Sequence, residues 1–95
     1  MFLGAYHFAG DPTALLSGYD RLIQGFPLET TDLHVCVVGE AGITVYDACP
    51  DAPTFAQFSQ SPEFLGAIRS AGLPEPRVEP LGEVRLARLR EAGGA

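Results

Sequence analysis

The chain begins with an apolar run that gives way to a helical stripe. Residues 2–8 form a short apolar and aromatic run and predict a strand. Asp11 and Pro12 then predict a helix start, because Asp11 can accept a backbone N–H as N-cap and Pro12 stands where no N–H is needed. The following apolar residues recur at three- and four-residue spacing: Leu15, Leu16, Tyr19, Leu22, Ile23 and Phe26. This spacing predicts an amphipathic helix that ends at Gly25 and Pro27.

Two further runs are rich in β-branched residues. They cover residues 32–38 and 43–49, and the sequence Gly-Glu-Ala-Gly at 39–42 separates them. Short β-rich runs joined by a glycine-containing turn predict a β-hairpin.

The second half of the chain predicts another helical region and a last strand. The helical region begins at 50–53 and restarts at Ser61-Pro62, again a cap residue followed by proline. A final extended segment runs from Arg77 to about Leu89 and alternates only in part. Because it contains Pro80 and Gly82, we expect an edge strand or a bulge there.

The resulting order is β-α-β-β-α-β, which predicts an α+β protein of the ferredoxin-like type. Its four-stranded antiparallel sheet would carry two helical regions on one face. The other face then needs a cover, and a second copy of the chain would supply it, so we expect a homodimer. We expect residues 1–90 to form a single domain and residues 91–95 a flexible tail.

Composition narrows the function classes. The chain has 95 residues, a hydrophobic fraction of 46%, a net charge of −6 and no lysine, which argues against nucleic-acid binding. It contains no apolar run of the roughly 18 residues that a membrane span needs, and no basic-then-apolar start typical of a secretory signal. No phosphate loop, dinucleotide fingerprint or zinc-type spacing is present, so we expect no cofactor and no metal. Cys36 and Cys49 are interpreted as unpaired thiols of a cytoplasmic protein.

Strand periodicity places several reactive side chains on one face of the hairpin. If the turn lies at Glu40-Ala41, His34 is opposite Asp47. One face then carries His34, Cys36, Val38, Ile43, Val45, Asp47 and Cys49. The other face carries Leu33, Val35, Val37, Thr44, Tyr46 and Ala48, and we expect this second face to be the ordinary core-like one.

His34 and Asp47 are the candidate catalytic residues. A carboxylate that fixes the imidazole tautomer is a common arrangement for a general base. Cys36, on the same face, is a candidate activated thiol. The alternative is a cross-strand polar pair beside a buried thiol, without chemistry.

Further residues are candidates for ligand binding. Tyr6 and His7 end the first strand, and one of them should share a face with Asp47, although the sequence does not say which. Tyr19 lies on the helical stripe with its hydroxyl at an expected pocket rim, and Phe58 would help to make a cavity apolar. Ordinary core packing is the alternative for each of them.

A family resemblance rests on residues 45–64. Val45-Tyr46-Asp47-Ala48-Cys49, Phe55, Phe58, Ser61-Pro62 and Phe64 resemble the third strand and second helix of the dimeric α+β-barrel superfamily, in particular its antibiotic-biosynthesis-monooxygenase-like branch. The chain departs from that pattern in having Asp47 for Glu, Cys49 for Trp and Phe58 for a helix histidine. That histidine ligates iron in haem-degrading relatives, so haem binding is not expected here.

The resemblance implies two classes of function. The first is a cofactor-independent monooxygenase, isomerase or cyclase that acts on a small apolar or aromatic metabolite. The second is a small-ligand-binding or structural dimer without turnover. The first is favoured here, and the two differ in whether His34 and Asp47 converge in an apolar pocket.

Overall fold

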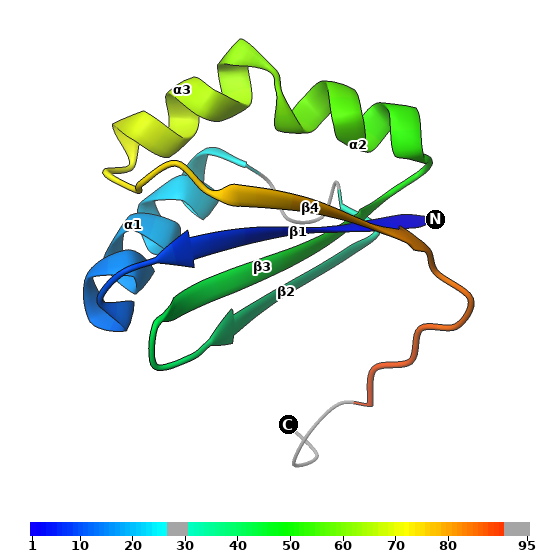
Figure 1. Ribbon diagram of the computed structural model, residues 1–95, viewed down its shortest axis with the longest axis horizontal. Helices are drawn as coiled ribbons and strands as arrows, with labels where there is room; N and C mark the ends of the chain where they lie inside the picture. Colours follow the sequence, from blue (N-terminus) through cyan, green and yellow to red (C-terminus); the bar gives the residue numbers. More distant parts are fainter. Residues whose placement is uncertain (27–30, 91–95) are drawn as a thin grey trace.

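The computed structural model describes residues 1–26 and 31–90 of the chain. The elements within these residues are β1 (Phe2–Ala9), α1 (Pro12–Gly25), β2 (Leu33–Val38), β3 (Gly42–Cys49), α2 (Ala52–Ser59), α3 (Pro62–Ser70) and β4 (Arg77–Glu83). The strands form one antiparallel sheet in the order β2-β3-β1-β4, and the helices lie on one side of it (Figure 1). This is the predicted α+β, ferredoxin-like arrangement. The predicted tail at 91–95 and the helix-ending Pro27 lie outside the described residues.

Each helix begins at a capping side chain, and the caps of α1 and α3 are the ones that the sequence predicts. The side chains of Asp11, Asp51 and Ser61 accept the backbone N–H of the residue three positions later, and a proline stands in the first turn of each helix. Since Ser61 caps a new helix, the second helical region consists of two helices. No helix of the described part is long and apolar enough to cross a membrane.

The last strand is an edge strand with an irregular register, as predicted. Leu3 pairs with Gly82 whereas Gly4 pairs with Pro80, so Leu81 is an extra residue on β4. The predicted extent to about Leu89 is wrong, because β4 ends at Glu83. One further ladder bond follows the strand, from the Val84 N–H to the Met1 carbonyl at 2.8 Å.

The helices cover the face of the sheet that carries the polar residues, which corrects the expected core face. Ile43 and Val45, on the face of His34 and Asp47, are buried beneath the helices. On the opposite face Val35 and Val37 are 38% and 47% exposed. Strand β1 explains the choice, since its large aromatic residues all point to the helical side: Phe2, Tyr6 and Phe8.

Two glycines permit close contacts that support this layer. A Cβ on Gly4 would overlap the ring of Phe55, so the missing side chain lets α2 pack directly on β1. Gly42, with φ of 155°, begins β3 where a Cβ would overlap the backbone carbonyl of Phe8. The first contact sets how closely α2 approaches the sheet, and the second sets how closely the start of β3 approaches the end of β1.

Candidate functional site

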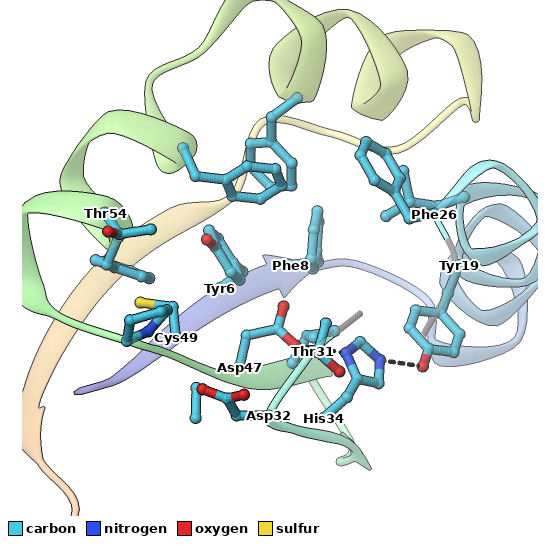
Figure 2. Close-up of a pocket in the computed structure, with 17 residues that line it drawn as sticks. Tyr6, Phe8, Tyr19, Phe26, Thr31, Asp32, His34, Asp47, Cys49 and Thr54 are labelled. Atoms are coloured by element: carbon cyan, nitrogen blue, oxygen red, sulfur yellow. Dashed lines mark hydrogen bonds and ion pairs between the residues drawn. The ribbon is translucent and has the colours of Figure 1, made fainter. Parts of the chain in front are cut away.

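A cavity of about 350 Å³ lies between the helices and the sheet. Strands β1, β2 and β3 form its floor, helices α1, α2 and α3 form its walls, and several of the lining side chains are aromatic (Figure 2). The rings pack in a continuous series: Phe26 on Phe58 at 6.1 Å, Phe58 on Phe64 at 4.8 Å, Phe64 on Tyr6 at 5.0 Å, and Tyr6 on Phe55 at 5.7 Å between centroids. Because Phe58 is 40% exposed and still lines the cavity, it stands at the mouth. The volume lies near the lower end of the roughly 300–1,000 Å³ typical of ligand sites.

A hydrogen-bonded chain of three side chains borders this cavity. The register pairs His34 on β2 with Asp47 on β3, as the hairpin pattern predicts. His34 Nδ1 lies 2.6 Å from Asp47 Oδ1, and His34 Nε2 lies 2.6 Å from the hydroxyl of Tyr19 on α1 (Figure 2). A carboxylate can only accept, so Nδ1 carries a proton and donates it, and Nε2 of the neutral ring accepts from Tyr19. Tyr19 therefore connects α1 to the sheet through His34.

This chain can move a proton. Burial raises the pKa of Tyr19, and negative charge at Cys36, Asp47 and Asp20 raises it further, so the hydroxyl keeps its proton at neutral pH. When His34 becomes an imidazolium, Nε2–H donates to Tyr19 and the Asp47 carboxylate stabilises the added charge. The arrangement is chemically suited to take up or release one proton at the cavity.

Tyr6, not His7, shares the face of Asp47. Tyr6 pairs with Val45 on the helix-covered side and lines the cavity. Burial raises its pKa well above the usual range, with smaller contributions from Asp47 and Cys49, so the hydroxyl is neutral.

The structure places His7 on the opposite, helix-free face, away from the cavity. Its Nδ1 lies 3.0 Å from Thr44 Oγ1 and its Nε2 lies 2.8 Å from Glu79 Oε1.

Neither cysteine is arranged as a reactive thiol. Cys36 pairs with Val45 on the same face as His34 but does not line the cavity, and burial raises its pKa, with a further contribution from Asp20. A raised pKa leaves less thiolate at neutral pH, which is the opposite of activation. Cys49 does line the cavity, and its thiol bonds to the Asp51 carbonyl at 3.3 Å. Both cysteines are free.

The structure adds three cavity-lining residues that were not among the candidate site residues of the sequence analysis. Asp32, Cys49 and Thr54 line the cavity together with the predicted Tyr6, Tyr19, His34, Asp47 and Phe58. Asp32 precedes His34 by two positions, so the strand period could have found it. Thr54 reaches the cavity from the first turn of α2, for which the sequence held no signal.

The lining of the cavity also limits what it can hold. No lysine or arginine is among the described residues that line it, whereas Asp32 and Asp47 are. In residues 1–26 and 31–90 no three histidine, cysteine or acidic side chains gather in a way that could hold a metal ion. An anionic ligand would meet no positive side chain here.

Comparisons with protein-family models, with curated proteins and with solved structures find no match to this chain.

Proposed function

We propose that this protein is a cofactor-independent enzyme, of monooxygenase, isomerase or cyclase type, that acts on a small apolar or aromatic metabolite. The observation that carries the proposal is the Tyr19–His34–Asp47 hydrogen-bonded chain, which is set against an aromatic cavity. We also propose membership of the dimeric α+β-barrel superfamily, on the motif at residues 45–64 and the β2-β3-β1-β4 sheet.

The three reaction types share their first step. A substrate C–H or O–H bond breaks, the proton enters the hydrogen-bonded chain, and the electron pair stays on the substrate as an enolate or phenolate. Returning the proton to another carbon gives an isomer, and attack of the carbanion on a carbonyl of the same molecule gives a ring. Reaction of the carbanion with dioxygen gives a hydroperoxide, which loses water to leave a carbonyl.

Proton exchange tests this step without knowledge of the product. We would incubate small aromatic ketones and phenols in D2O and follow the loss of acidic C–H signals by NMR. Wild-type protein should accelerate exchange of at least one of them, and His34→Gln and Asp47→Asn should each reduce that rate by about 10-fold or more. Cys36→Ser is the control, because Cys36 shares their face of the sheet but lies outside the cavity.

A non-catalytic ligand-binding protein is the second candidate. Both ring nitrogens of His34 already have partners, as in a purely structural polar network. Saturable binding of the same compounds with no acceleration of exchange by wild-type protein would establish this candidate and refute the first.

We further propose that the protein is a cytoplasmic homodimer joined through its helix-free face. Val35 and Val37 are exposed on that face, and covering them against a second copy would bury apolar surface. The two free thiols suit a reducing compartment. Val37→Asp should convert the dimer to a folded monomer in sedimentation velocity, whereas Gly66→Ala, on the helical side, should not. A wild-type monomer at high protein concentration would refute the dimer.

A further inference from the structure

Two polar atoms at the cavity are not used by the Tyr19–His34–Asp47 chain. The first is the second carboxylate oxygen of Asp47, since the bond to His34 uses only Oδ1. Figure 2 shows the Asp47 side chain between Tyr6 and His34, with its carboxylate directed into the cavity. By contrast, His34 has hydrogen bonds on both nitrogens and no lone pair that faces a ligand.

The second atom is the hydroxyl oxygen of Tyr6. The Tyr6 residue is only 2% exposed, and its hydroxyl has no hydrogen-bond partner in the described part of the chain. Among the described residues, every side-chain nitrogen or oxygen that is fully covered has a hydrogen-bond partner. The Tyr6 hydroxyl has none, so it is not fully covered, and it is accessible from the cavity that Tyr6 lines. A ligand in the cavity can therefore accept a hydrogen bond from this hydroxyl.

The sheet register places Asp47 and Tyr6 on the same, helix-covered face of the sheet, and both residues line the cavity. Asp47 pairs with Gly4, and Tyr6 is two residues further along the same strand and on the same face. Such diagonal neighbours are within reach of long and aromatic side chains. Because Gly4 has no side chain, the ring of Phe55 occupies the space above it and packs against Tyr6.

We propose that Asp47 is the base that contacts the substrate and that Tyr6 donates a hydrogen bond to the substrate's carbonyl oxygen. The substrate is then a neutral, planar aromatic ketone with an acidic C–H beside its carbonyl group. This inference rests on the proposed function and deepens it. Tyr19 and His34 become positioning residues, which hold the carboxylate through Oδ1.

The step balances within the cavity. The C–H bond breaks and its proton forms an O–H bond with the free oxygen of Asp47. The C–H electron pair becomes the new carbon–carbon π bond, and the carbonyl π pair moves to the oxygen, where Tyr6 donates to the developing enolate. The carboxylate charge disappears as the enolate charge forms, so the net charge of the cavity does not change. No oxidant or cofactor is needed.

The lining supports the substrate class independently of the mechanism. Aromatic walls suit a flat ring system, and the cavity volume restricts the ligand to a small one. Two acidic side chains and no cation among the lining residues disfavour carboxylates and phosphates. A neutral ketone is not repelled by the acidic side chains, and its carbonyl oxygen can accept the hydrogen bond of the Tyr6 hydroxyl.

Hydrogen exchange of 2-tetralone in D2O tests the assignment of the base. Asp47→Asn should lower the exchange rate at least about 100-fold, because it removes the base itself. His34→Gln and Tyr19→Phe leave the carboxylate in place and should each lower the rate only about 10-fold. His34→Gln should also change the pH at which exchange is half-maximal, which a purely structural role would not. A loss for His34→Gln as large as that for Asp47→Asn would overturn the inference and leave the proposed function standing.

Binding of 2-naphthol, followed by its fluorescence, tests Tyr6 separately from turnover. Tyr6→Phe removes only the hydroxyl and keeps the ring, and it should weaken binding about fivefold and slow 2-tetralone exchange about 100-fold. Tyr46→Phe is the matched control on the helix-free face and should change neither quantity. Unchanged binding and exchange in Tyr6→Phe would overturn the role of Tyr6. If wild-type protein exchanges no ketone at all, the proposed function and the assignment of the base fail together.

Discussion

Replacing Gly4 by alanine should destabilise the protein, because the new methyl group would occupy space that the Phe55 ring fills. The overlap is with the Phe55 ring, which is 5% exposed and packs between Phe2 and Tyr6. Overpacking of this kind costs about 1–3 kcal/mol. Alanine also has less backbone entropy than glycine in the unfolded chain, which offsets this loss of stability by about 0.5–1 kcal/mol. Because the overlap is severe, the upper half of that cost applies, and we expect a net loss of about 1–2.5 kcal/mol, or a Tm lower by about 4–20 °C for a domain of this size.

Urea unfolding of four proteins measures this effect: wild type, Gly4→Ala, Phe55→Leu and the double variant. The smaller leucine should relieve the overlap, so the double variant should lose less free energy of unfolding than the two single losses added together. Gly66→Ala is the matched control, since a Cβ there contacts nothing within 4 Å and α3 should gain stability. Additive losses, or a Gly4→Ala variant as stable as wild type, would show that the ring does not occupy this space. Since Phe55 also lines the cavity, Gly4→Ala should weaken binding of 2-naphthol as well.

Three other predictions follow from local geometry. Gly42→Ala should destabilise the protein by more than 1 kcal/mol in urea unfolding, because its backbone conformation is strained for alanine and the overlap is with a backbone carbonyl. The hydrogen bonds that Asp51 accepts from Thr54 lower the pKa of its carboxyl group, so Asp51→Ala should lower Tm at neutral pH. The difference in Tm from wild type should shrink as the pH falls below the ordinary aspartate pKa of about 3.9. Burial raises the pKa of both Cys36 and Cys49, so iodoacetamide should alkylate the folded protein more slowly than a free thiol at neutral pH and faster as the pH rises.

The hairpin shows how far the sequence alone can lead. Its turn fixes the register, and a period of two then places His34 opposite Asp47 wherever the rest of the chain lies. The three helix starts are equally local, because a cap side chain and a proline act within one turn. These features needed no knowledge of tertiary contacts.

The identity of the covered face did need such knowledge. Either face of the hairpin offers enough apolar side chains to be buried, and the choice depends on where β1 directs Phe2, Tyr6 and Phe8. The register of β1 against β3 joins strands that are distant in sequence, and no turn connects them. For the same reason the sequence could not separate Tyr6 from His7 or predict that Tyr19 bonds to His34.

The polar groups of the cavity differ in a way that bears on function. Tyr19, His34 and Asp47 satisfy one another, so their burial beside aromatic rings is compensated and their positions are fixed. The Tyr6 hydroxyl and the second carboxylate oxygen of Asp47 have no hydrogen-bond partner among the described residues, and both side chains line the cavity. A stable core would be better served by phenylalanine at position 6, which keeps the ring contacts with Phe55 and Phe64 and avoids the unpaired hydroxyl. Tyr6→Phe should therefore stabilise the free protein while it weakens binding of the ketone, and this opposition is what a ligand-binding hydroxyl predicts and a packing residue does not.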